Sequence, residues 1–77
     1  TASAQSRLAG IAAQDAVIRQ QIENLNVNIE RTRRMLADGA ATPKQLDDLT
    51  GQMEVLRKQS EANNSQRRTV AAEMQGV

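Results

Sequence analysis

The chain carries two stripes of mainly apolar residues at alternating spacings of three and four, separated by one Gly/Pro interruption. The first stripe comprises Leu8, Ile11, Asp15, Ile18, Ile22, Leu25, Ile29, Thr32 and Leu36. The second comprises Leu46, Leu49, Met53, Leu56, Ser60, Asn63, Arg67, Val70 and Met74. This spacing is the a/d heptad pattern of a coiled coil. Two matching stripes on one chain predict two helices that pack against each other.

The interruption contains residues that end one helix and begin another. Gly39 can adopt the left-handed conformation that terminates a helix. Thr42, followed by a proline and then by Gln45, is typical of an N-cap with its reciprocal capping partner. Asp47 and Asp48 add negative charge close to the positive end of the second helix. The turn is therefore expected between the two stripes.

These signals predict an all-α fold, a two-helix antiparallel coiled-coil hairpin. We expect the first helix over about 3–37, the turn over 38–42 and the second helix over about 43–75, as one unit across 1–77. A single continuous helix is the alternative. It is disfavoured because an interior proline costs roughly 3 kcal/mol and a glycine about 1 kcal/mol relative to alanine.

Polar residues interrupt the seam in the half farthest from the turn. Asp15 lies in the first stripe, while Ser60, Asn63 and Arg67 occupy consecutive positions of the second. An antiparallel alignment places Asp15 opposite either Asn63 or Arg67, and such a pair would fix the register at some cost in stability. A surface for another subunit is the alternative. We expect the rod to be held at its open end by a host domain, or laterally by copies of itself.

The composition argues against most catalytic chemistry. The 77 residues include no histidine, no cysteine and no aromatic residue. An imidazole base, a thiolate and the common zinc or haem ligand sets are therefore missing. A net charge of +1 gives no long-range attraction to a polyanion. We expect a protein that is not an enzyme, carries no metal or cofactor, and binds no nucleic acid.

The segment from Arg31 to Asp47 reads RTRRMLADGAATPKQLD, with Met35 four residues after Arg31 and Thr42 seven residues after Met35. It resembles the hairpin tip of HlyD-type membrane fusion proteins, the periplasmic adaptors of bacterial efflux pumps and type I secretion systems. In that family an Arg, a Leu and a Ser mark the tip at these spacings. Here Met replaces Leu and Thr replaces Ser, and both changes keep the broad chemistry of the position.

The resemblance implies that the chain is a segment of a larger adaptor, inserted between two halves of a lipoyl-like domain. It further implies a periplasmic protein that is anchored at the inner membrane, oligomerises with itself and works with an inner-membrane transporter. The tip is expected to dock on the helical end of a TolC-type outer-membrane channel. The implied docking residues are Arg31, Met35, Asp38, Gly39, Ala40, Ala41 and Thr42.

The residues alone leave other classes open. One is a generic interaction coiled coil, such as the dimerisation arm of a cytosolic protein, whose turn has no partner. In that case Thr42 is only a helix cap, Arg31 a solvated charge and Met35 a residue partly packed beside the seam. A nucleic-acid clamp is a weaker third class, which a salt-dependent binding assay would expose.

Overall fold

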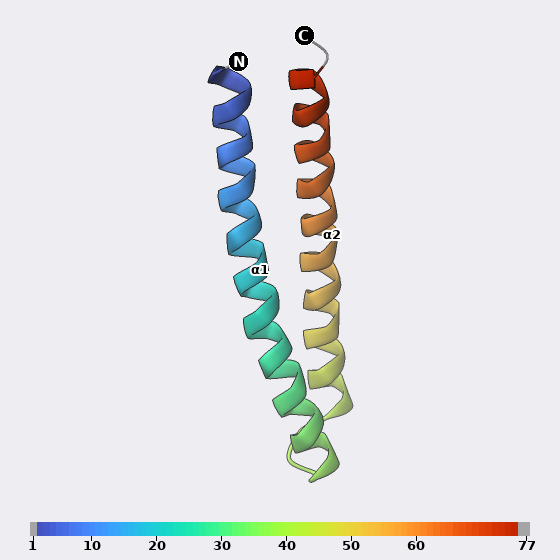
Figure 1. Ribbon diagram of the computed structural model, residues 1–77. Coiled ribbons are helices and arrows are strands. Elements are labelled where there is room, and N and C mark those ends of the chain that lie inside the picture. The colour runs from blue at the N-terminus through green and yellow to red at the C-terminus, as the bar shows by residue number, and fades with distance from the viewer. Residues whose placement is uncertain (1, 76–77) are drawn as a thin grey trace.

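The computed structural model describes residues 2–75 and shows two helices joined by a short turn (Figure 1). α1 spans Ala2–Ala37 and α2 spans Pro43–Gln75. The helices run side by side in opposite directions, with the start of α1 and the end of α2 at one end of the molecule and the turn at the other. The described residues include no strand. The predicted all-α hairpin is confirmed, and α1 begins one residue earlier than expected.

The molecule is a rod without a second layer of structure. Its principal extents are 59 × 14 × 12 Å and its radius of gyration is 17.5 Å. A compact globular chain of this length would have a radius of gyration of about 11 Å. Each helix therefore buries only the stripe that faces the other helix, and every remaining side is available to solvent or to partners.

The apolar core lies in the half of the rod nearest the turn, as the stripes predict. It is built around three buried residues, with four partly buried side chains packed against them. The buried three are Leu25, Ile29 and Met53, and the packed four are Ile22, Leu46, Leu49 and Leu56. This cluster holds α1 and α2 together beside the turn.

Packing continues into the half nearest the chain ends. Ile18 and Val70 are buried there, and Val70 is only 2% exposed. Ala4 is also buried and extends the first stripe by one step beyond Leu8. Small and β-branched side chains thus keep the two helices in contact along this part of the seam, although polar residues interrupt it.

A left-handed glycine ends α1. Gly39 has a φ of 76°, and its backbone N–H donates to the Leu36 carbonyl at 3.1 Å. The N–H of Ala40 donates to the Met35 carbonyl at 2.7 Å. These two bonds form a Schellman motif, which satisfies carbonyls that the end of a helix would otherwise leave unpaired.

The acidic pair after the turn does not have the role expected from the sequence. The first turn of α2 contains no acidic residue, because Asp47 and Asp48 lie in its second turn. The field of the helix dipole falls off within the first turn. Asp48 instead pairs with Lys44, one turn earlier, at 3.1 Å. The helix-dipole explanation for the pair is therefore wrong.

Alanine substitutions at two glycines should change stability in opposite directions. A Cβ added at Gly39 or at Gly51 meets no atom within 4 Å, so only backbone preferences decide. Gly39→Ala should lower the free energy of unfolding by about 1 kcal/mol, because alanine is disfavoured at positive φ. Gly51→Ala should raise it by about 0.5–1 kcal/mol, because Gly51 lies inside α2. Urea denaturation followed by circular dichroism measures both, and stabilisation by Gly39→Ala would contradict the left-handed turn.

Candidate functional site

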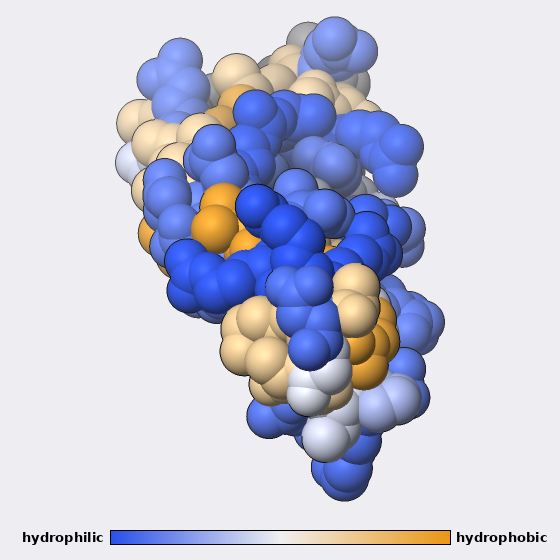
Figure 2. Space-filling view, turned by 90° about the horizontal axis from the view of Figure 1, so that it is seen from below, coloured by the Kyte–Doolittle hydropathy of each residue, from blue (hydrophilic) through white to orange (hydrophobic). Residues whose placement is uncertain are grey.

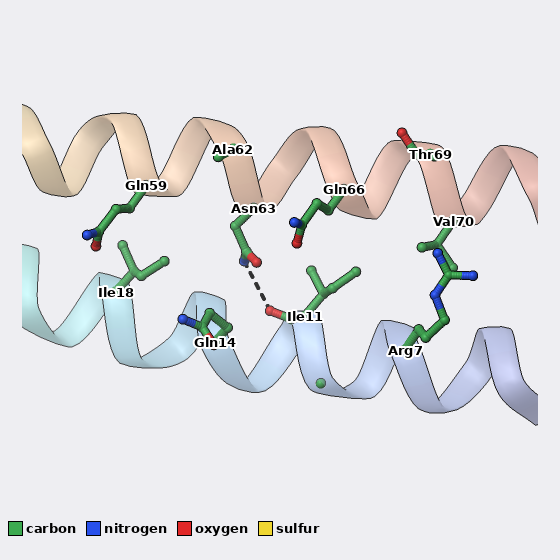
Figure 3. A pocket seen from close by; sticks show the side chains of 11 residues that line it. Arg7, Ile11, Gln14, Ile18, Gln59, Ala62, Asn63, Gln66, Thr69 and Val70 are labelled. Carbon is green, nitrogen blue, oxygen red and sulfur yellow. Dashed lines mark hydrogen bonds between the residues drawn. The ribbon is translucent and has the colours of Figure 1, made fainter.

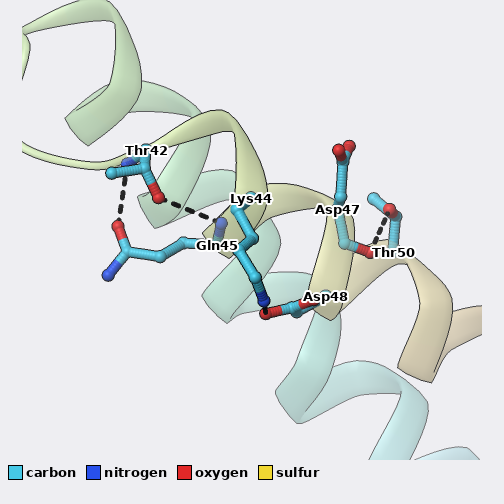
Figure 4. Close-up of polar contacts among 6 residues, drawn as sticks. All are labelled: Thr42, Lys44, Gln45, Asp47, Asp48 and Thr50. Carbon is cyan, nitrogen blue, oxygen red and sulfur yellow. Dashed lines mark hydrogen bonds and ion pairs between the residues drawn. The ribbon is translucent and has the colours of Figure 1, made fainter.

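The start of α2 at the tip is held by a reciprocal pair of hydrogen bonds (Figure 4). The backbone N–H of Gln45 donates to Thr42 Oγ1 at 3.2 Å. The backbone N–H of Thr42 donates to Gln45 Oε1 at 2.8 Å. This is the capping box that the sequence predicts, and it satisfies two donors that the helix end leaves without partners.

The tip presents a small surface of weakly apolar and neutral residues. Figure 2 views the rod from this end and shows such residues gathered at the turn, bordered by hydrophilic side chains. Residues 38–40 are exposed and Ala41 is half-buried. Met35 is 39% exposed. The hydrogen bond from Ala40 to the Met35 carbonyl ties the turn to the last turn of α1.

Basic side chains surround the turn, and three of the four have partners. Arg33 pairs with Glu30 at 2.9 Å, and Arg34 Nε donates to the Glu30 backbone carbonyl at 3.4 Å. Lys44 pairs with a carboxylate one turn along α2. Arg31 is exposed and forms no hydrogen bond or ion pair with any described residue. Its guanidinium is thus the basic group at the tip that is available to a partner.

Arg31 and Met35 lie one helical turn apart on the same side of α1, because residues i and i+4 are neighbours on a helix surface. The pair therefore joins a free cation to an exposed, flexible thioether that adapts to irregular apolar surfaces. Asp38 adds an exposed carboxylate that has no described partner. Thr42 differs from these three residues because its hydroxyl already serves as the cap of α2.

The buried polar residue of the seam is Asn63, which is 7% exposed. Its side-chain Nδ2 donates to the backbone carbonyl of Ile11 on α1 at 3.1 Å (Figure 3). This hydrogen bond crosses the seam and fixes the position of Asn63 on α2 relative to Ile11 on α1. The sequence gives no sign of this bond, because a backbone carbonyl is an acceptor at every position of a helix.

The expected contact of Asp15 with Asn63 or Arg67 is not formed among the described residues. Asp15 pairs with Arg19 of its own helix, with Nε and Oδ2 2.8 Å apart. Arg67 is exposed instead of occupying the seam, and it has no described hydrogen-bond or ion-pair partner. Burying an unpaired guanidinium is costly, and the long arginine side chain can reach solvent from a seam position.

The described residues show no arrangement typical of a metal or membrane-spanning site. They contain no group of three or more His, Cys, Asp or Glu side chains that could hold a metal ion. Neither described helix has an apolar stretch that could cross a bilayer.

Comparison with known proteins assigns no family to the chain. No protein-family model matches it, and searches of curated proteins and of solved structures find no significant match. The basis for a function is therefore the shape of the hairpin and the residues at its tip.

Removing the capping hydroxyl should destabilise the hairpin from the tip. Thr42→Ala eliminates the acceptor for the Gln45 N–H and should lower the free energy of unfolding by about 1 kcal/mol. Thr50→Ala is the matched control, because the Thr50 hydroxyl donates only to the Asp47 carbonyl within α2. Urea denaturation measures the free energy of unfolding of both variants and of the unmodified chain. Equal losses of stability would show that the cap has no special role.

Proposed function

We propose that this hairpin is the non-catalytic docking arm of a periplasmic adaptor, of the HlyD type, in a tripartite efflux or secretion system. Its tip would dock on the helical end of a TolC-type outer-membrane channel. The observation that carries the proposal is the exposed, unpaired guanidinium of Arg31 beside the exposed Met35 at the tip. Both side chains stand at the motif spacings that resemble the tip of that family.

The shape of the molecule supports a spacer role. A rod 59 Å long and 14 Å or less in its other dimensions places the tip far from the ends of the chain. The two helices extend the chain along one axis. The fold therefore holds the tip at a distance from the other end of the rod. In the proposed assembly this reach bridges part of the distance between the two membranes.

The tip is organised before any partner arrives. The Schellman motif at Gly39 and the capping box between Thr42 and Gln45 fix the turn from both sides. A fixed turn loses little conformational entropy on binding. Arg31 can then donate to carboxylate or carbonyl oxygens of the channel, while Met35 fills an irregular apolar contact.

The opposite end of the rod supports insertion into a host domain. The outer ends of α1 and α2 lie next to each other there (Figure 1), and Arg7 pairs with Glu73 across them at 2.9 Å. A hairpin with adjacent ends can enter a host domain without separating its two halves. We propose that the host is the lipoyl-like domain of the full-length adaptor, which is anchored at the inner membrane, oligomerises and contacts the transporter.

Reversing the charge of Arg31 should abolish transport by the full-length protein. Arg31→Asp replaces the free cation at the tip with an anion, so a partner surface that offers acceptor oxygens would repel it. Helicity of the 77-residue hairpin should be unchanged, because Arg31 has no described partner within the chain. Cellular export assays and circular dichroism give the two measurements.

Arg57→Asp serves as the matched control. Arg57 is also exposed and has no described hydrogen-bond or ion-pair partner, but it lies on α2 away from the turn. This variant should transport normally. Normal transport by Arg31→Asp would contradict the docking role, and equal loss in both variants would show that the effect is not specific to the tip.

A further inference from the structure

Methionine is the only readily oxidised kind of side chain in this protein. The 77 residues include three methionines and no cysteine, tryptophan, tyrosine or histidine. Two-electron oxidants such as peroxides convert the thioether of methionine into a sulfoxide, which reductase enzymes can convert back. The thioethers of Met35, Met53 and Met74 are therefore the targets that the chain offers to such an oxidant.

The fold exposes the three methionines to different degrees. Met53 is 7% exposed and belongs to the apolar core in the half of the rod nearest the turn. Met74 is half-buried near the end of α2. Met35 is 39% exposed. Because oxidation of sulfur depends on the access of the oxidant, Met35 should react first and Met53 last.

Met35 stands at a position where the fold can accept a sulfoxide. It lies one residue before Leu36 of the first stripe, so its side chain is beside the seam and not in it. Its backbone carbonyl accepts the Ala40 N–H of the Schellman motif at 2.7 Å, and oxidation of the side chain leaves this bond in place. An oxygen added to the exposed thioether would stay in water and leave the hairpin folded.

The added oxygen would lie beside the unpaired guanidinium of the tip. Arg31 precedes Met35 by one helical turn and has no described partner. A sulfoxide oxygen accepts hydrogen bonds, and a guanidinium carries five N–H donors. Asp38, three residues after Met35, offers only acceptor oxygens when it is ionised. The sulfoxide should therefore pair with Arg31 and occupy donors that docking requires.

We propose that Met35 is an oxidation site at the tip, and that its oxidation by hydrogen peroxide or related peroxides switches docking off. The sulfur lone pair attacks one peroxide oxygen, so that an S–O bond forms and the O–O bond breaks. The sulfur loses two electrons and the peroxide gains them. The second oxygen leaves as hydroxide, takes the proton of the transferred oxygen and becomes water. The switch, unlike the oxidation itself, rests on the proposed docking function.

The order of oxidation can be measured in the 77-residue chain. Hydrogen peroxide is added, catalase stops the reaction at intervals, and mass spectrometry follows the tryptic peptides. Trypsin places the three methionines on separate peptides, 35–44, 45–57 and 69–77. The peptide with Met35 should gain an oxygen atom first and the peptide with Met53 last. In concentrated urea, which unfolds the chain, the rates should become similar, because burial causes the difference.

Circular dichroism should show unchanged helicity once Met35 has reacted. Equal rates for Met35 and Met53 in the folded chain would overturn the proposed site, and a difference of the same size in urea would do so too. Loss of helicity on oxidation of Met35 alone would show that the modification acts on the fold instead of on the tip.

Nuclear magnetic resonance of the arginine side chains tests the pairing with Arg31. The Nε–H signal of Arg31 should shift when Met35 is oxidised. The signal of Arg57, which is also exposed and without a described partner, should not move. A chain with Met35→Leu, treated with peroxide in the same way, should show no shift at Arg31. An Arg31 signal that stays in place in the oxidised chain would overturn the pairing.

The effect on docking is measured with the purified full-length adaptor and a purified TolC-type channel. The adaptor is treated with hydrogen peroxide, which catalase removes before mixing. Its affinity for the channel should fall about tenfold, because the contact would bury a polar group in place of an apolar one. A methionine sulfoxide reductase should restore the affinity. Peroxide should cause no such fall with Met35→Leu, whereas Met74→Leu should respond like the unmodified adaptor.

Two results would overturn the switch. One is an unmodified adaptor whose affinity survives oxidation of Met35, and the other is an equal loss of affinity in Met35→Leu. An untreated adaptor that does not bind the channel would instead contradict the docking proposal, and the switch would fail with it. The order of oxidation in the 77-residue chain does not depend on the channel, so the two failures are distinguishable.

Discussion

The antiparallel alignment of α1 against α2 is the constraint on which the rest of the structure depends. Isolated helices draw little stability from their own sequence, and most of it comes from packing one face against a partner. The alignment is set near the turn by Gly39 and the Thr42 cap, along the seam by the bond from Asn63 to Ile11, and at the open end by an ion pair. A shift of one heptad would break both the Asn63–Ile11 bond and the Arg7–Glu73 ion pair.

The features that could be predicted from the sequence obey local rules. The bounds of both helices, the left-handed Gly39 and the capping box between Thr42 and Gln45 follow from residue type and spacing, because each involves neighbours in the chain. The half of the seam nearest the turn was equally predictable, because apolar periodicity selects the buried stripe. These features fixed the fold class and the position of the tip.

The features that could not be predicted involve polar side chains with several possible partners. Asp15 pairs within its own helix, since Arg19 lies one turn away and needs no cross-helix alignment. Arg67 turns to solvent because its reach allows it to leave the seam. Asn63 finds a backbone carbonyl instead of a side chain. The sequence also could not show that Arg31 lacks a described partner. That depends on which neighbouring side chains pair with each other, as Arg33 does with Glu30. Periodicity assigns a residue to a face, but it does not choose the partner of a long or polar side chain.

The proposed function divides the rod into a tip that meets a channel and an opposite end that enters a host domain. Site-specific photocrosslinking in cells that contain the full-length adaptor tests the central claim most directly. A photoreactive amino acid in place of Met35, at the tip, should crosslink to a TolC-type channel. The same group in place of Val17, far from the turn and more exposed than Met35, should not. Crosslinks to the channel from Val17 alone, or from neither position, would contradict the claim that the turn is the docking end.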